Sequence, residues 1–246
     1  MKVVAVIPAR FGATRFPGKL LKKLGEHSVI ATTYLAVKNS GLFDEVIVAA
    51  DDEKIIQDIE GVHGKAVMTS SNHASGSDRI AEVIQDMDVD VIVNVQGDEP
   101  FTATQALASL IDVFKNDHDK KVDVATLMEK LELKEDVQNP NNVKVVVGNN
   151  MDALYFSRSA IPFVRDENVS VDYFKHVGIY AYRKKALMAF TQLEPGTLEM
   201  AEKLEQLRYL ENGYRIKVVE TQYKTIGIDT PEDLEEARVY LGNLEQ

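Results

Sequence analysis

The sequence predicts an α/β protein whose core is a doubly wound, mostly parallel sheet. Through the first half of the chain, short apolar runs typical of strands alternate with segments whose apolar residues recur at helical spacing. These runs are apolar on both faces, as is typical of parallel strands covered by helices on both sides. At 246 residues, one domain over 1–246 is the expected organisation.

Each element of the first half follows from this alternation. The expected strands are Val3–Ile7, Glu45–Ala50, Ala66–Met68 and Val91–Val95. The expected helices are Val29–Val37, Glu53–Ile59, Ser77–Met87 and Gln105–Phe114. In the third helix Ile80, Val83, Ile84 and Met87 form one apolar stripe.

The second half differs because strand-like runs follow one another with little helix between them. The runs are Val122–Met128, Val143–Val147, Ala153–Phe156 and Val177–Tyr182. They predict an antiparallel, β-rich extension over 122–182 that carries an acceptor site or a subunit interface. Helices at Ala186–Phe190 and Leu198–Leu210, a strand at Ile216–Val219 and a helix capped by Thr230-Pro231 complete the chain.

A basic, glycine-containing turn follows the first strand. In Pro8-Ala-Arg-Phe-Gly-Ala-Thr-Arg-Phe-Pro-Gly-Lys19, the glycines allow close backbone approach, and Arg10, Arg15 and Lys19 supply donors for several phosphate oxygens. The turn matches neither GxxxxGK[ST] nor GxGxxG. We therefore expect a different kind of phosphate-binding loop; the alternative is a surface turn that is basic by chance.

Two aspartates, Asp98 and Asp229, each come at the end of a strand or an extended segment and are candidate metal ligands. Asp98 lies in Gln96-Gly-Asp-Glu-Pro100, directly after a buried strand, where parallel sheets bind ligands. It is the best candidate ligand for a hard divalent cation, although an Asp-Glu-Pro turn could also explain it. Asp229 precedes the last helix and could share that cation, or could belong only to the helix cap.

A third candidate loop is Asn72-His-Ala-Ser-Gly-Ser-Asp-Arg79. Ser75 and Ser77 are possible helix caps, Gly76 gives access to the backbone, and Arg79 is unfavourable in a first helical turn unless an anion lies near. This mismatch favours a ligand-binding role.

Composition excludes several classes of function. With 28 Lys and Arg against 39 Asp and Glu, the net charge of −11 argues against a nucleic-acid partner and for one small polyanion with a metal ion. The chain has no cysteine, which excludes thiolate catalysis and fits a reducing cytosol. The sequence contains no run of about 18 apolar residues, so no membrane insertion is predicted. No signal segment is found at its start, and a cytoplasmic protein is expected.

Taken together, the motifs resemble one family. PARFGATRFPGK, HASGSDRIAEV, VNVQGDEP, YFSRSAIP, KHVGIYAY, MAEKLEQLRYLENG and GIDTPEDL occur in the order seen in the 3-deoxy-D-manno-octulosonate (Kdo) cytidylyltransferases, across nearly the whole chain. The resemblance implies a nucleotide-diphospho-sugar transferase-like fold. It also implies a bacterial enzyme that joins CTP and Kdo to give CMP-Kdo and pyrophosphate, with Mg²⁺, for lipopolysaccharide biosynthesis.

The resemblance also assigns site residues. Catalytic roles fall to Arg10, Lys19 and Asp98, and the metal to Asp98 and Asp229. The implied nucleotide-binding residues are Ala9, Arg10, Arg15, Lys19, Ala74, Ser75, Gly76 and Arg79. The implied sugar-binding residues are Gln96, Arg158, Arg165, His176, Glu205 and Gln206; Arg158 could instead be a surface residue, and Glu205 an exposed residue paired with Arg208.

A homodimer is expected through the β-rich extension, since Leu154, Phe156, Ile161 and Phe163 are surplus to a nucleotide-binding core. The alternative is that these residues pack under the sheet. The nearest rival function is a CMP-sugar synthetase for sialic acid or a modified Kdo. A non-catalytic nucleotide-binding regulator is a remote alternative, because Lys19, Asp98 and Asp229 are all present.

Overall fold

A computed structural model describes residues 1–12, 16–73, 75–166, 168–223 and 226–244. The chain divides into two compact units, the first formed by Met1–Ala108 with Thr225–Gln246 and the second by Ser109–Lys224. No helix of the described residues is long and apolar enough to cross a membrane.

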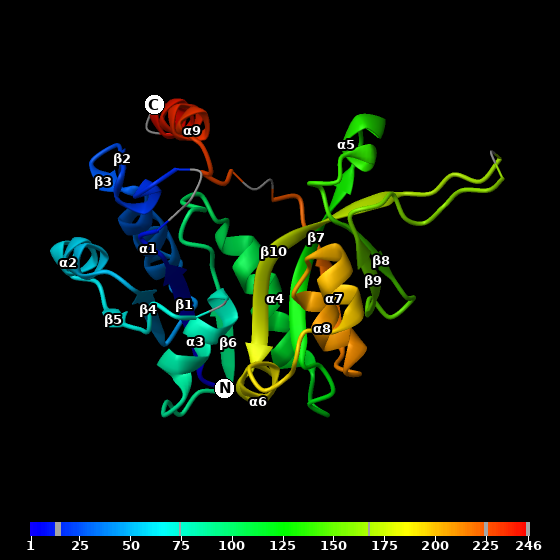
Figure 1. Ribbon diagram of the computed structural model, residues 1–246, viewed down its shortest axis with the longest axis horizontal. Helices are drawn as coiled ribbons and strands as arrows, with labels where there is room; N and C mark the ends of the chain where they lie inside the picture. Colours follow the sequence, from blue (N-terminus) through cyan, green and yellow to red (C-terminus); the bar gives the residue numbers. More distant parts are fainter. Residues whose placement is uncertain (13–15, 74, 167, 224–225, 245–246) are drawn as a thin grey trace. The chain divides into compact units, whose positions relative to one another are not determined.

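The first unit contains parallel strands in the order β6-β1-β4-β5 (Figure 1). They are β1 (Val3–Ala9), β4 (Glu45–Ala50), β5 (Ala66–Met68) and β6 (Val91–Asn94). The predicted parallel arrangement is confirmed, and β4 and β5 have the predicted bounds. Val4 through Ile7 and Val91 through Val93 are fully buried, as expected of strands that are apolar on both faces.

Helices α1 (Val29–Asn39), α2 (Glu53–Gly61) and α3 (Gly76–Ile84) follow β3, β4 and β5, and each begins at a polar cap. The side chains of Ser28, Asp52 and Ser75 accept hydrogen bonds from backbone N–H groups in the first turns. Because α2 and α3 start where the chain leaves the parallel strands β4 and β5, the loops before these two helices lie at the carboxyl ends of the strands.

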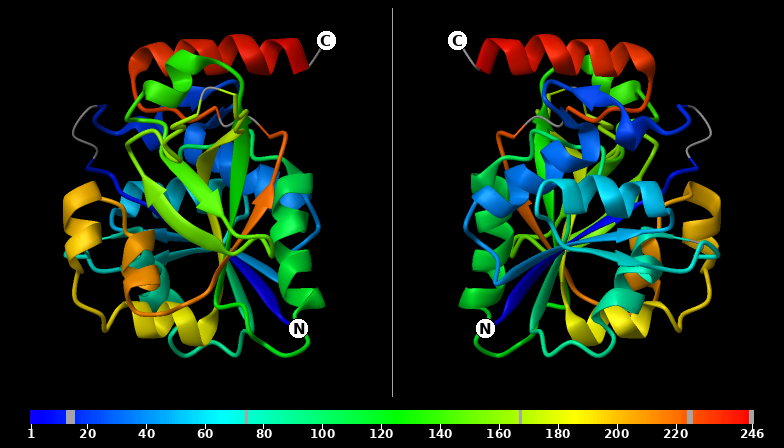
Figure 2. Two further views of the ribbon diagram at one scale, coloured as in Figure 1. Left: turned by 90° about the vertical axis from the view of Figure 1, so that its right-hand side faces the viewer. Right: turned by 90° about the vertical axis from the view of Figure 1, so that its left-hand side faces the viewer.

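Small elements not predicted from the sequence complete the first unit. Lys19–Leu21 forms a 3₁₀ turn, and β2 (Lys23–Leu24) pairs with β3 (His27–Ser28). The last helix, α9 (Pro231–Leu244), lies beside this pair, and Arg238 donates to the Lys23 carbonyl (Figures 1 and 2). Its N-terminus is as predicted, since Thr230 Oγ1 accepts from the Asp233 N–H.

The second unit contains mainly antiparallel strands. Strand β10 (Tyr173–Arg183) pairs antiparallel with β7 (Val124–Leu131) and with β8 (Lys144–Val147), which pairs with β9 (Ala153–Ser157). β11 (Ile216–Glu220) is parallel to β7. The antiparallel character of the β-rich extension is therefore confirmed, and Gly148–Met151 forms the turn between β8 and β9.

The helices of the second unit differ from prediction in one place. Helix α4 (Thr104–Asn116) leads into this unit, followed by α5 (Lys134–Gln138) and α6 (Lys184–Phe190). The predicted helix Leu198–Leu210 is instead two helices, α7 (Thr197–Glu202) and α8 (Gln206–Glu211). The break follows from Lys203, whose left-handed backbone (φ 55°) ends α7. Leu198 is consequently exposed, whereas Leu204 and Leu207 are buried.

Candidate active site

The basic loop after β1 ends in a tight turn that presents Lys19. Gly18 has a φ of 66°, in the left-handed region that favours glycine, and it precedes the 3₁₀ turn Lys19–Leu21. The Lys19 N–H donates to the Phe16 carbonyl at 3.1 Å, and buried Leu20 anchors the turn in the core. The Lys19 side chain is therefore aimed by the local backbone.

Lys19 joins the two predicted metal-binding aspartates. Its Nζ lies 2.5 Å from Asp98 Oδ2 and 2.8 Å from Asp229 Oδ1. Asp98 and Asp229 lie 131 positions apart in the printed sequence, so only the fold brings them to one cation. The Lys19 side chain is 13% exposed, and those of Asp98 and Asp229 are 28% and 48% exposed. Lys19 is therefore more shielded from water than the two aspartates that contact it.

Asp98 is positioned by a close approach of backbones beneath it. A Cβ on Gly97 would lie 2.9 Å from Ile30 Cδ1 and 3.1 Å from the Pro8 carbonyl oxygen, so a larger residue there would force the Ile30 side chain and the Pro8 backbone to shift. The Asp98 carbonyl in turn accepts from the Ile228 N–H at 3.0 Å. This bond fixes the segment that carries Asp229 beside Asp98.

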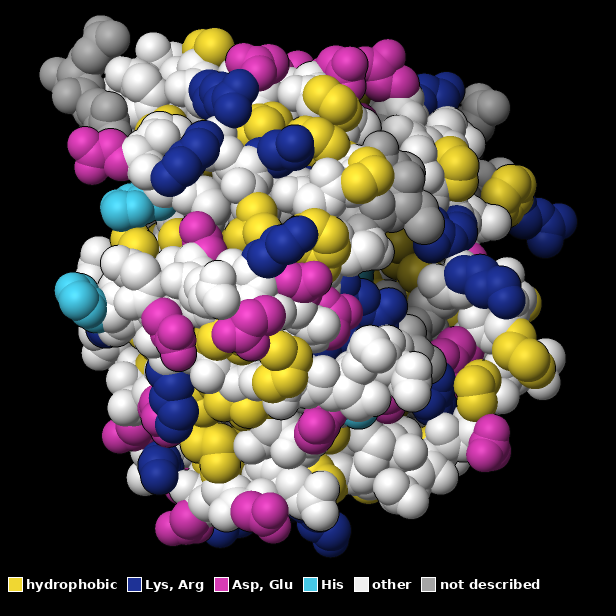
Figure 3. Space-filling model, turned by 60° about the vertical axis from the view of Figure 1, so that its left-hand side comes forward, with side chains coloured by type: hydrophobic (Ala, Val, Ile, Leu, Met, Phe, Trp, Pro, Cys, Tyr) yellow, Lys and Arg dark blue, Asp and Glu magenta, His cyan; other side chains and the backbone are white. Residues whose placement is uncertain are grey.

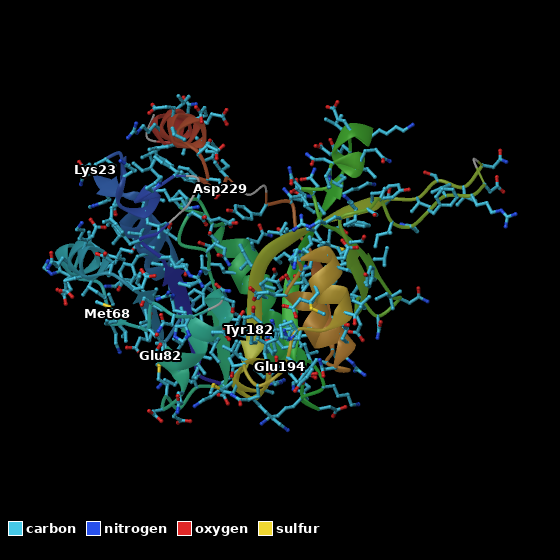
Figure 4. The ribbon with its side chains drawn as sticks, in the orientation of Figure 1. Lys23, Met68, Glu82, Tyr182, Glu194 and Asp229 are labelled. Atoms are coloured by element: carbon cyan, nitrogen blue, oxygen red, sulfur yellow. The ribbon has the colours of Figure 1, made fainter. Side chains whose placement is uncertain are left out.

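Asp229 is held by the cap of α9. Asp233 Oδ2 accepts from the N–H groups of both Asp229 and Thr230 at 2.8 Å. Asp229 lies two residues before the start of α9 and is labelled in Figure 4. The two interpretations of Asp229 thus apply to different residues: Thr230 and Asp233 form the cap, and the Asp229 carboxylate is directed to Lys19.

The cluster keeps Lys19 charged. Burial alone would lower the pKa of Lys19, but the charges and hydrogen bonds of Asp98 and Asp229 outweigh it, so the pKa is raised above the usual 10.5. Lys19 is therefore an ammonium ion throughout the neutral range and a hydrogen-bond donor to anions.

The donor set fits a small divalent cation. Oxygens of Asp98 and Asp229 already converge on one cationic atom. A magnesium ion is typically held by one or two carboxylates together with substrate phosphates and waters. Among the described residues no group of three or more His, Asp or Glu forms a complete protein site, so a metal here would need ligands from a substrate.

A hollow of about 260 Å³ connects the predicted loops of the first unit. Its wall is formed by Pro8, Arg10, Gly12, Lys19, Leu20, Gly76, Gln96, Gly97 and Asp98. The basic loop, the Gln-Gly-Asp loop and the first residue of α3 therefore face one space. Arg10, Lys19, Gly76, Gln96 and Asp98 were all predicted as site residues from the sequence, and the fold brings these five together.

The Asn72–Arg79 loop is attached to the basic loop through backbone groups. Arg10 Nη2 donates to the His73 carbonyl at 2.8 Å, and the Ser75 hydroxyl caps α3 in a capping box with Asp78. Arg79, in contrast, is fully buried and bonded to Asp51 and Thr69. The predicted nucleotide-binding residues Arg15 and Ala74 lie outside the described residues.

Predicted sugar-binding residues of the second unit include a half-buried histidine, His176. His176 Nε2 lies 2.9 Å from Thr126 Oγ1, and its ring contacts those of Phe156 and Tyr180. Burial, and secondly the positive charge of Lys175, lower the pKa of His176 from 6.5 to about 3. The imidazole is therefore neutral at physiological pH, and it can donate or accept a hydrogen bond but not serve as a cation.

The other predicted sugar-binding residues of this unit have diverse surroundings. Arg158 donates from Nε to the Glu202 carbonyl and from Nη1 to the Pro140 carbonyl, so it joins the end of α7 to the segment after α5. Glu205 and Arg165 are exposed, and Gln206 is buried in the first turn of α8. Arg208 forms a two-bond ion pair with Glu199, at 2.6 Å for each bond.

Two further residues, Asp51 and Lys144, contact segments that carry predicted site residues but were not themselves predicted from the sequence. Asp51, which directly follows β4, accepts from the Phe11 N–H in the basic loop. Lys144 is fully buried, and its Nζ donates to the carbonyls of Asn139, Asn142 and Arg158 at 2.9, 2.5 and 2.7 Å. The position of Asp51 at a strand end was a usable signal, whereas Lys144 lies within an apolar run and gave none.

Comparison with known proteins assigns the family. The profile of the family described as Cytidylyltransferase matches residues 4–221. The chain belongs to the cytidylyltransferase family. The chain is 54% identical over 244 residues to a 3-deoxy-manno-octulosonate cytidylyltransferase of Flavobacterium johnsoniae. The match covers 99% of this chain and 100% of the relative. It is 48% identical to the protein of that name from Fusobacterium nucleatum, covering 98% and 97%.

A solved structure resembles this cytidylyltransferase over its full length. That structure is of CMP:2-keto-3-deoxy-manno-octonic acid synthetase complexed with CTP, with 40% identity and a TM-score of 0.94 over 99% of this chain and 100% of the other. A 4-diphosphocytidyl-2C-methyl-D-erythritol synthase from Anaerococcus prevotii, 18% identical with a TM-score of 0.63 over 98% of both chains, shares the fold. The predicted α/β fold class is thus confirmed.

Proposed function

We propose that this cytidylyltransferase activates Kdo, converting CTP and Kdo to CMP-Kdo and pyrophosphate. The observation that carries the proposal is the convergence of Asp98 and Asp229 on Lys19, which lines a hollow together with Asp98, Arg10 and Gly76. Such a site combines cations for a polyphosphate with carboxylates for a metal. Full-length relatives at 54% and 48% identity, both named for this reaction, support the choice of substrates.

The triphosphate is assigned to the basic loop. Arg10, Arg15 and Lys19 bind the β- and γ-phosphates and stabilise the charge that grows on pyrophosphate as it leaves. Because Lys19 remains protonated, it supplies this charge without a proton transfer. Ala9, Ala74, Ser75 and Gly76 recognise the cytidine largely through backbone groups, and Arg79 supports their loop.

Asp98 and Asp229 are proposed to hold Mg²⁺. Bound there, the ion would lower the pKa of the sugar hydroxyl and offset the α-phosphate charge. The protein's own residues orient the reactants so that the anomeric oxygen of Kdo forms a bond to the α-phosphorus while the bond to the pyrophosphate oxygen breaks in line. The hydroxyl proton passes to solvent, so the proposal needs no dedicated protein base.

The sugar is assigned to a mixture of short polar and charged side chains. Its carboxylate and hydroxyls would be bound by Gln96, Arg158 or Arg165, His176, Glu205 and Gln206. His176 is suited to a neutral hydroxyl, because burial keeps it uncharged. Arg165 is exposed. The described hydrogen bonds of the Arg158 side chain use Nε and Nη1, both to carbonyls, so we assign its Nη2 to the sugar carboxylate.

We further propose that both units form one functional cytidylyltransferase domain over 1–246 and that the chain is a homodimer. The family match over 4–221 includes parts of both units. In the 122–182 extension, Leu154 is 64% exposed and Phe163 is 86% exposed, and both could be covered by a second copy. Phe156 is fully buried, so the expectation that it contributes to an interface is wrong, because it packs in the core.

The proposed setting is the bacterial cytoplasm, where CTP is available, in lipopolysaccharide biosynthesis. No nucleic-acid partner is proposed. On the face drawn in Figure 3, the acidic and basic side chains of the described residues are interspersed, unlike the basic tract that binds nucleic acid.

The experiment that tests this function measures pyrophosphate release with each of the four common ribonucleoside triphosphates. Each is combined with Kdo, with sialic acid or with no acceptor. The proposal expects release only with CTP and Kdo together. Release with sialic acid in preference to Kdo would favour the rival CMP-sugar synthetase, and binding of CTP without release under any condition would favour a regulator.

A further inference from the structure

Arg79 lies inside the first unit, at the carboxyl ends of two strands. Its side chain is 0% exposed, and its guanidinium donates to Thr69 Oγ1 and, at 3.1 Å, to Asp51 Oδ2. Asp51 and Thr69 directly follow β4 and β5, and the Thr69 hydroxyl donates to the Ala50 carbonyl at 2.9 Å. The guanidinium therefore joins the segments that leave two adjacent strands.

Asp51 uses its second oxygen for the basic loop. Its Oδ1 accepts from the Phe11 N–H at 2.9 Å, one residue after Arg10. The β1–β4 register pairs Ala9 with Ala50, so Asp51 lies opposite the first residue of the loop. The neighbouring Asp52 has a different role, because its carboxylate caps α2.

A carboxylate at this place opposes the binding of a polyphosphate. The Asp51 side chain is only 13% exposed, so water screens its charge poorly, and it is bonded to the loop proposed to bind the β- and γ-phosphates. Arg79 is the compensating charge. A buried guanidinium remains protonated, and its rigid fork holds the carboxylate in one orientation.

We propose that Arg79 and Asp51 are a positioning pair, which holds the basic loop in place for the nucleoside triphosphate. Asp51 fixes the backbone of the loop at Phe11, and Arg79 holds and neutralises Asp51 so that the phosphates meet a net positive loop. The pair acts through the Phe11 backbone and the neighbouring Arg10, without contact to the nucleotide. This inference rests on the proposed function, since it presupposes a triphosphate substrate.

A second connection from the same helix supports this role for α3. Glu82, labelled in Figure 4, lies three positions after Arg79 and bonds the His73 ring, while the His73 carbonyl accepts from Arg10. Glu82 also accepts from the Ser70 N–H at 3.0 Å. Two side chains of α3 therefore hold both the basic loop and the loop proposed to recognise the base.

The test compares dissociation constants for CTP and for CMP, measured by calorimetry with wild-type protein and three variants. Arg79→Met exposes the loop to an uncompensated carboxylate, so CTP should bind about tenfold more weakly and CMP, with fewer charges, less than about threefold more weakly. Asp51→Asn keeps an acceptor for Phe11 and should leave CTP binding within about threefold of wild type. Asp51→Asn/Arg79→Met removes both charges and should recover most of the CTP affinity.

Two control variants remove an arginine or an aspartate carboxylate that does not contact the basic loop in any described bond. Arg183→Met removes an arginine that is paired with Asp117 at 2.6 Å in the second unit, and Asp52→Asn changes the neighbouring cap. Both should bind CTP as wild type does. A double variant as weak as Arg79→Met, or equal losses for CTP and CMP, would overturn the neutralising role, because a general structural defect predicts both.

A further pair of variants applies if Arg79→Met does not fold. Asp51→Ala removes the acceptor for the Phe11 N–H and should weaken CTP binding about fivefold or more, whereas Asp51→Asn should not; equal binding by the two would overturn the positioning role. If wild-type protein binds no nucleoside triphosphate, the proposed function fails. If wild type binds CTP and Arg79→Met binds it equally well, only the present inference fails.

Discussion

Lys19 Nζ lies 2.5 Å from Asp98 Oδ2, so a cation proposed for phosphates and a carboxylate proposed for a metal are directly bonded. The pair joins the basic loop after β1 to the loop after β6. Any substitution of Asp98 therefore changes the proposed metal site and also alters one partner of Lys19. The predictions for these two residues must be separated by measuring nucleotide affinity as well as turnover.

Asp98→Asn is expected to lower turnover at least about a hundredfold, because the lost charge acts on the transition state. CTP affinity should fall far less, since Arg10 and Lys19 remain. Steady-state kinetics and calorimetry provide the two values, and Asp229→Asn should behave similarly. Asp90→Asn is the control, because Asp90 contacts the Lys2 N–H at the opposite ends of the strands. Near-wild-type turnover in Asp98→Asn contradicts the metal assignment.

Lys19→Ala is expected to lower the turnover number by about a hundredfold at saturating CTP, with a smaller loss of CTP affinity. The reason is that charge grows on the departing pyrophosphate and is not fully present in bound CTP. Because the pKa of Lys19 is raised, the wild-type rate should show no loss of an ammonium group between pH 7 and pH 9. A variant that loses only CTP affinity would make Lys19 a ground-state binding residue.

Glu205→Ala is expected to raise the Kdo concentration needed for half-maximal rate severalfold to about a hundredfold, as for lost hydrogen bonds to substrate hydroxyls. The corresponding CTP value should remain nearly unchanged. Glu236→Ala, an exposed position on α9, is the control. If the CTP requirement rises and the Kdo requirement does not, the sugar has been assigned to the wrong residues.

His176 should make stability depend on pH. Its pKa is about 3 in the folded protein and near 6.5 in the unfolded chain, so between these values the unfolded state binds more protons. The free energy of unfolding should therefore fall as the pH falls through this window, with a slope approaching about 1.4 kcal/mol per pH unit from this group. Urea unfolding of wild type and His176→Gln at several values from pH 4 to pH 7 measures this slope, which should be smaller in the variant. Identical slopes would show that His176 is not buried in its neutral form.

The dimer proposal predicts the mass of a dimer in sedimentation at micromolar concentration. Replacing exposed Phe163 with Ser should weaken association, whereas Val239→Ser on α9, at 67% exposure, should not. Sedimentation of wild-type protein as a monomer under these conditions is the contrary result.

Much of the first unit could be predicted because its strands are continuous apolar runs ending in polar loops. Glu45–Ala50 and Ala66–Met68 were predicted with their observed bounds. The division between α7 and α8 could not be, because it depends on a left-handed Lys203, a residue type that rarely marks a helix end. The start of β10 at Tyr173 was also missed, since Lys175 and His176 interrupt the apolar pattern.

The candidate site was partly predictable for a similar reason. Asp98 was found because carboxylates at the end of a buried parallel strand point to the ligand-binding edge. The bond between Lys19 and Asp229 could not be inferred, because it depends on how α9 returns to the first unit. Arg79 was assigned to the nucleotide, since the sequence does not show that its charge is met by Asp51.

Phosphorus NMR of the complete reaction tests the central claim most directly. Wild-type protein is incubated with CTP, Kdo and Mg²⁺, and the spectrum is followed over time. The account predicts that the CTP resonances are replaced by equal amounts of a phosphodiester, from CMP-Kdo, and pyrophosphate, and only when Kdo is present. Formation of CDP with orthophosphate, or loss of CTP at the same rate without Kdo, would contradict attack of the sugar on the α-phosphate.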